Sequence, residues 1–86
     1  MKIKLHGVRR VYITGDYIRL DDLLKYASLV SSGGEAKFLI QGGEVLVGGE
    51  PCRIRGKKIR PGEVVRYDDV TLAVRSNDRD IAVILP

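Results

Sequence analysis

The chain has 86 residues, with 15 Lys and Arg against 11 Asp and Glu and a formal charge of +4 at pH 7. This length allows one compact domain with a small core, and the positive balance favours a polyanionic partner. The single cysteine, Cys52, excludes an intrachain disulfide and a cysteine-based metal site within one chain. The start of the chain lacks the apolar stretch of a signal peptide, and its late apolar run at residues 81–85 is too short to span a membrane. We therefore expect a soluble cytoplasmic protein that contacts no membrane.

Short strands followed by a helix are expected in the first third of the chain. Apolar residues alternate weakly up to the turn-like Thr14-Gly15-Asp16. From residue 20 the apolar residues recur at the spacing of one helix face, at Leu20, Leu23, Leu24 and Ala27. Asp21 and Asp22 would lie at the positive end of the helix dipole. This pattern predicts a helix over about residues 20–29.

A second helix is predicted by a capping box in Ser32-Gly33-Gly34-Glu35. In this motif the serine hydroxyl accepts a backbone N–H and the glutamate reaches back to another. Ala36, Leu39 and Ile40 supply the buried stripe of the helix. Gly42-Gly43 ends it, because glycine enters the left-handed conformation without steric cost.

The remainder of the chain predicts a small, mainly antiparallel sheet. Val45 and Val47 are expected inward, Gly48-Gly49 forms a primed hairpin turn, and the return strand places Cys52 and Ile54 inward and Arg53 and Arg55 outward. Further strands are expected at residues 64–65, 70–74 and 81–85. The fold class is therefore α+β, with two helices packed against the sheet.

Several motifs in this order resemble the S4 RNA-binding domain. They are Arg19-Leu20-Asp21, Ser31-Ser32, Glu35-Ala36, Leu39-Ile40, Gly-Glu-Val-Leu-Val-Gly-Gly-Glu at residues 43–50 and Arg-Pro-Gly-Glu-Val-Val at residues 60–65. The run Gly-Gly-Glu-Ala-Lys-Phe-Leu-Ile-Gln at residues 33–41 is similar to the signature of the small stand-alone members of the YaaA type. The resemblance implies an S4-like fold with a two-helix corner, the αL motif, on the sheet. It also implies one domain over residues 1–86, with a matched core at about 19–67 and strand extensions at both ends.

The resemblance implies binding of structured RNA, and the residues support this physically. A helix N-terminus offers unpaired N–H groups to phosphate, and Gly33 and Gly34 allow a nucleic-acid backbone to approach closely. Many S4 domains carry an arginine at the position of Gly33, so other cations have to supply the charge here. The candidate RNA-binding residues are Arg19, Lys25, Ser31, Ser32, Gly33, Gly34, Lys37, Gln41, Arg53, Arg55, Lys57, Lys58 and Arg60. Within this set the segment 53–60 is expected to form one wall of the binding surface.

The expected mode of recognition is by shape and phosphate backbone, because few aromatic side chains are present to stack on bases. Of the tyrosines, Tyr26 is the one most worth testing for stacking. The candidate ligands are ribosomal RNA, a ribosomal particle or tRNA, and an RNA-processing protein is a further candidate partner. The charges at Arg55, Lys57 and Lys58 are expected to be exposed and to add little stability.

Other functions remain open from sequence. The sheet edge or the apolar residues 81–85 would suit a protein-interaction adaptor, and phosphate contacts alone do not separate RNA from DNA. The serine cap and the basic segment also have purely structural readings, as a helix start and a solvated turn. We expect no catalytic residue, metal site or cofactor, since His6 is the sole histidine and neither Gly42-Gly43 nor Gly48-Gly49 has nucleotide-binding spacing.

Overall fold

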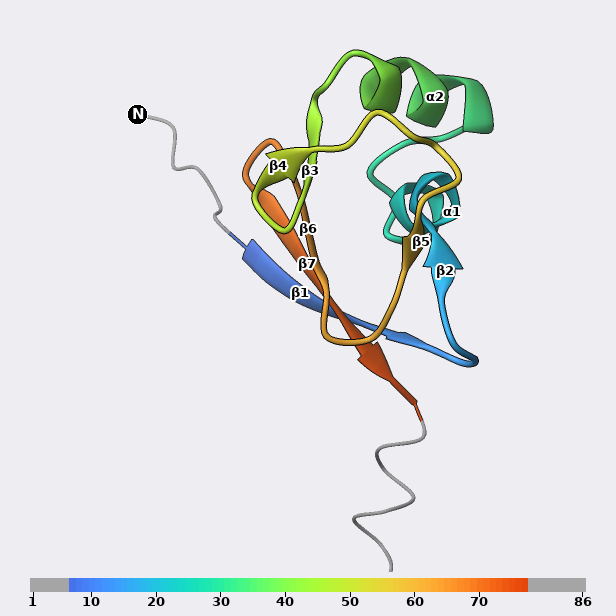
Figure 1. The fold of residues 1–86 in the computed structure, drawn as a ribbon, viewed down its shortest axis with the longest axis vertical. Coiled ribbons are helices and arrows are strands. Elements are labelled where there is room, and N and C mark those ends of the chain that lie inside the picture. Colours follow the sequence, from blue (N-terminus) through green and yellow to red (C-terminus); the bar gives the residue numbers. More distant parts are fainter. Residues whose placement is uncertain (1–6, 78–86) are drawn as a thin grey trace, which may run out of the picture.

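A computed structural model describes residues 7–77 of the protein, and its elements follow the α+β order predicted (Figure 1). In chain order they are β1 (Gly7–Ile13), β2 (Ile18–Arg19), α1 (Leu20–Tyr26), α2 (Gly33–Gln41), β3 (Val45–Val47), β4 (Glu50–Pro51), β5 (Lys58–Ile59), β6 (Val64–Tyr67) and β7 (Val70–Ser76). His6 and the strand expected at residues 81–85 lie outside the described residues. No helix within 7–77 is long and apolar enough to cross a membrane.

The strands form two sheets, of which the larger has the order β1-β7-β6-β3-β4. Three of its four pairings are antiparallel, and the fourth, β1 with β7, is parallel. A parallel pair needs a long connection, and here almost the whole domain lies between the two strands. The smaller sheet pairs β2 with β5 antiparallel, so that Arg19 lies opposite Lys58.

Both helices lie beside the large sheet, as Figure 1 shows. Each helix buries one stripe of side chains. Leu20, Leu23 and Leu24 of α1 are fully buried, as the helical spacing predicts, while Ala27 is partly buried. From α2 the buried side chains are Ala36 and Ile40. The strands complete the core with Val11, Ile13, Val45, Ile59, Val65, Leu72 and Val74.

Both helices end in a Schellman motif, in which one residue after the helix takes a left-handed conformation. That residue is glycine after α2 and serine after α1. After α2, Gly43 has φ +79°, and the N–H groups of Gly43 and Glu44 donate to the carbonyls of Ile40 and Leu39 at 3.0 and 3.1 Å. After α1, Ser28 takes the equivalent place with φ +61°, and its neighbour Leu29 donates to the Leu24 carbonyl at 3.0 Å.

The prediction that the first helix extends to residue 29 was therefore wrong by three residues, since α1 ends at Tyr26. Serine carries no obvious signal for a left-handed backbone, and the apolar spacing continues through Ala27. The end of α2 was predicted correctly, because glycine is the residue that most often takes the left-handed position after a helix.

The hairpin after Gly43 follows the prediction through its turn and then departs from it. Gly48 and Gly49 both have positive φ, at +61° and +90°, as a type I′ turn requires. The return strand β4 ends at Pro51, whose nitrogen carries no hydrogen to extend the ladder. Cys52 is partly buried against the core, but Ile54 is exposed, so the inward placement of Ile54 was wrong.

Candidate nucleic-acid interface

The start of α2 forms the serine half of the predicted capping box, whereas the glutamate bonds Ser31, one residue before the N-cap Ser32. The backbone N–H of Glu35 donates to Ser32 Oγ at 3.1 Å. In return, Glu35 Oε1 accepts the backbone N–H of Ser31 at 2.9 Å and the Ser31 hydroxyl at 3.2 Å. Both serine side chains thus make structural contacts, and they fix the conformation of the chain that leads into Gly33 and Gly34.

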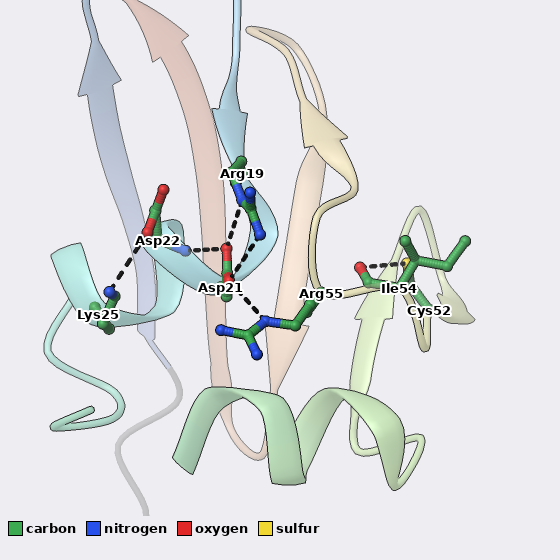
Figure 2. Close-up of polar contacts among 7 residues, drawn as sticks. All are labelled: Arg19, Asp21, Asp22, Lys25, Cys52, Ile54 and Arg55. Carbon is green, nitrogen blue, oxygen red and sulfur yellow. Dashed lines mark hydrogen bonds and ion pairs between the residues drawn. The ribbon is translucent and has the colours of Figure 1, made fainter. Parts of the chain in front are cut away.

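A buried carboxylate at the start of α1 joins two of the candidate arginines. Asp21 is only 3% exposed. It accepts hydrogen bonds from Nε and Nη2 of Arg19, both at 3.2 Å, and from Nε of Arg55 at 3.1 Å. The backbone N–H of Asp22 adds a further bond at 2.9 Å. Figure 2 shows the Asp21 carboxylate between the two guanidinium groups, with Arg55 reaching it from a segment far along the chain.

The electrostatics of Asp21 follow from this geometry. Burial by itself raises the pKa of the carboxyl, but the hydrogen bonds from Arg19 and Arg55 and the charge of Arg19 lower it by more. The pKa of Asp21 consequently lies below its ordinary value, and the group is ionised at neutral pH. Backbone bonds hold the same elements together, since the N–H groups of Leu20 and Asp21 donate to the carbonyls of Lys57 and Arg55 at 2.8 and 3.1 Å.

Asp21 leaves part of each arginine available for another partner. Arg55 bonds the carboxylate through Nε, so its Nη groups are turned toward the start of α2 (Figure 2). A Cβ built on Gly33 would lie 3.6 Å from Arg55 Nη2 and 4.0 Å from Lys25 Nζ. Two cations therefore lie next to the first residue of α2. We call Arg19, Lys25 and Arg55 the basic cluster.

Arg55 corrects two predictions made from the sequence. It does not point outward from a strand, because its side chain turns to α1 and pairs with Asp21. Its charge is also not a freely solvated one, since the partner carboxylate is buried. Lys25 differs in this respect, because its Nζ lies 3.5 Å from the half-exposed carboxylate of Asp22.

The segment 53–60 does not form a single wall. Arg53 lies at the far end of α2, where its Nη1 donates to the carbonyl of Gln41 at 3.0 Å and thereby caps the helix. Lys58 is placed beside Arg19 by the β2–β5 pairing, and its Nζ lies 5.0 Å from the centre of the Tyr17 ring. Lys57 and Arg60 are exposed, and the backbone N–H of Arg60 donates to Glu63 Oε1 at 2.6 Å.

Lys37 and Gln41 are both exposed on α2, one helical turn apart. Lys37 lies one turn beyond Gly33, so it extends the positive surface of the basic cluster along the helix. Gln41 lies at the opposite end of α2, with Arg53.

The residue that the sequence analysis missed is Asp21, which it assigned to the helix dipole together with Asp22. Only Asp21 is buried, and its partner Arg55 is 34 positions away. The motif Arg19-Leu20-Asp21 was the available signal. As to metal binding, the described part of the chain holds no group of three or more His, Cys, Asp or Glu side chains suited to an ion.

Comparison with known proteins agrees with this architecture. The family model described as the S4 domain matches residues 11–75, a longer stretch than the motifs at 19–67. The chain is also similar to the probable ribosome maturation protein RlbA of Bacillus subtilis (strain 168), with 40% identity over 58 residues. That alignment covers 67% of this chain and 82% of the relative. This protein therefore belongs to the S4 domain family.

Proposed function

We propose that the protein binds structured RNA through the surface formed by the basic cluster and the start of α2, and that it performs no chemistry of its own. Recognition is of helical shape and phosphate backbone. The two helices act as the αL corner of the family, with the N-terminus of α2 directed at the RNA. The protein works in the cytoplasm, where its ligand is ribosomal RNA, a ribosomal particle or tRNA.

The observation that carries the proposal is the meeting of three elements at Gly33. Lys25 comes from α1, Arg55 from the loop before β5, and Gly33 opens α2. A helix start offers N–H groups and a partial positive charge, and the two side chains add cations beside it. Since Gly33 has no side chain, a phosphate can approach both the helix backbone and the Arg55 Nη groups.

Asp21 supports the proposal by holding the arginines before RNA arrives. A guanidinium fixed through Nε keeps its Nη groups in one orientation, which lowers the entropy cost of binding phosphate. Lys37 extends the positive surface along α2. The name of the Bacillus subtilis relative supports RNA of a maturing ribosomal particle as the ligand.

Salt dependence and charge removal test this function. Affinity for a blunt RNA hairpin should fall about a hundredfold between about 50 and 200 mM salt if roughly four phosphates are contacted. The double variant Lys25→Gln/Lys37→Gln should bind more weakly, and its slope of log affinity against log salt should be smaller by about 2. These lysines are chosen over Arg55 because their removal leaves no buried carboxylate without its partner.

Arg66→Gln is the matched control, because it also removes an exposed positive charge. Arg66 neighbours the buried Val65 on β6, so its side chain lies on the sheet face opposite the core. The proposal fails if affinity hardly changes with salt, or if Arg66→Gln lowers log affinity by half as much as the double variant Lys25→Gln/Lys37→Gln does, because each charge would then count equally wherever it lies. A DNA hairpin of the same sequence reports on preference for RNA, and sequencing RNA crosslinked to the protein in cells would name the ligand. Crosslinking that recovers one dominant protein and no nucleic acid would favour the adaptor function.

A further inference from the structure

A hollow outside the basic cluster is lined by three tyrosines. It has a volume of about 260 Å³ and lies where the end of β1, the start of β2 and the end of α1 meet, with Tyr12, Tyr17 and Tyr26 among its lining residues. Tyr26 is 64% exposed and Tyr17 is 44% exposed, although both are large rings. A volume of this size is many times the ~30 Å³ that one water molecule occupies in the liquid. The hollow therefore has room for a planar ring.

A second hollow continues the first along β1 and carries positive charge. The two share Tyr12 and Tyr26, and the second is also lined by Arg9 and Arg10. Among residues 7–77, none of those that line either hollow is acidic. Arg9 is held in place, because its Nη1 donates to the carbonyl of Ala27 at the end of α1 at 2.8 Å. We call the two hollows together the tyrosine groove.

The tyrosine groove adjoins the basic cluster at two points. Tyr26 follows Lys25 directly on α1. Tyr17 lies under Lys58, which the β2–β5 pairing places opposite Arg19. A chain of nucleotides that leaves the basic cluster past Arg19 and Lys58 would therefore reach Tyr17, with Tyr26 across the same hollow.

We infer that the tyrosine groove binds an unpaired nucleotide that extends from the structured RNA on the basic cluster, with its base against Tyr26 and Tyr17 and its phosphate near Arg9. This inference rests on the proposed function and extends it to the single-stranded part of the ligand. Exposed aromatic rings with neighbouring cations are the features with which proteins hold single-stranded nucleic acids, because every base presents a flat face that stacks. Arg9 and Arg10 in the lining favour a polyanion over a peptide as the occupant.

The test compares a blunt RNA hairpin with the same hairpin carrying a short single-stranded tail of mixed sequence. The protein should bind the tailed hairpin about tenfold more tightly, a gain of about 1.4 kcal/mol, as expected when one base stacks on an aromatic ring. Tyr26→Leu should remove most of that difference while binding the blunt hairpin as the unaltered protein does. Tyr26→Phe, which keeps the ring, should retain the preference for the tail. Arg9→Gln should reduce the preference, and Arg66→Gln should leave it unchanged.

The outcomes separate this inference from the proposed function. If the unaltered protein binds both hairpins equally, or if Tyr26→Leu keeps the preference for the tail, the groove does not bind nucleotides and the proposed function stands. If the unaltered protein binds neither hairpin, both the inference and the proposed function are wrong. Thermal unfolding of the same variants gives the remaining readout. If Tyr26→Leu lowers the melting temperature strongly and leaves the preference for the tail intact, the groove holds part of this chain, and the inference is wrong.

Discussion

Replacing Asp21 by asparagine tests whether the buried carboxylate organises the basic cluster. The substitution keeps the shape of the side chain but removes the charge that pairs with Arg19 and Arg55. Breaking a fully buried ion pair costs about 3–5 kcal/mol. The partners here are 49% and 40% exposed, so water compensates part of the loss. We therefore expect the free energy of unfolding to fall by about 2–3 kcal/mol, which for a domain of this size lowers the melting temperature by about 10–20 °C.

The neighbouring Asp22 provides a matched control. Asp22→Asn makes the same chemical change one residue later, at a side chain that is 51% exposed and 3.5 Å from Lys25. Exposed pairs of this kind contribute little, so we expect a change below about 0.5 kcal/mol. Urea unfolding followed by far-ultraviolet circular dichroism measures both variants. Equal effects of the two substitutions would refute the role assigned to Asp21.

The pH dependence gives a second, independent check on Asp21. A carboxyl whose pKa is lowered in the folded state contributes its full stabilisation above the unfolded pKa, about 3.9 for aspartate, and loses it as the pH falls through the folded pKa. The stability difference between the unaltered protein and Asp21→Asn should therefore be largest near neutral pH and shrink below about pH 4. Contributions of other carboxylates cancel in this difference. A gap that stays constant into strong acid would contradict the ion-pair explanation.

Substitutions at the helix ends test the local geometry by the same unfolding measurement. Ser32→Ala should cost about 1 kcal/mol through the lost cap on the Glu35 N–H, and an unchanged stability would mean that the cap is replaced by water. Ser28→Gly should stabilise the protein by about 0.5–1 kcal/mol, because glycine adopts φ +61° without strain; a loss would show that the serine side chain has a role there. Gly43→Ala should cost about 1–2 kcal/mol, since a Cβ at φ +79° would also lie 2.8 Å from Arg53 Nη2. Part of this cost comes from the clash with Arg53, so Gly43→Ala should destabilise the Arg53→Ala variant less than it destabilises the unaltered protein.

How far the fold follows from sequence depends on whether the information is local. The cap at Ser32, the end of α2 at Gly43 and the Gly48-Gly49 turn were all predicted, because each conformation is set by residues within one turn of the chain. The end of α1 has the same Schellman geometry as the end of α2, but a serine such as Ser28 rarely adopts the left-handed conformation, so the sequence did not predict it. The parallel pairing of β1 with β7 was likewise invisible, because it joins strands at opposite ends of the described chain.

The candidate site shows the same limit in its charges. The sequence analysis selected the basic residues as candidate RNA contacts because they are crowded together. It could not tell which of them already bond to another part of the protein. Arg55 pairs with a carboxylate 34 positions earlier, and Arg53 caps a helix carbonyl 12 positions earlier. Adjacent aspartates look alike in a sequence, whereas burial separates Asp21 from Asp22 only once the loop before β5 is placed against α1.

The aromatic residues show why composition can mislead about recognition. A low aromatic content argued for binding by shape and backbone alone, since stacking on many bases needs many rings. One unpaired nucleotide, however, needs only one or two rings in the right place. The fold brings Tyr12 of β1, Tyr17 of the loop before β2 and Tyr26 of α1 to a single hollow, beside Lys58 and Arg9. Backbone recognition at the basic cluster and stacking in the tyrosine groove are therefore compatible on one small domain, and the tailed hairpin measures the second against the background of the first.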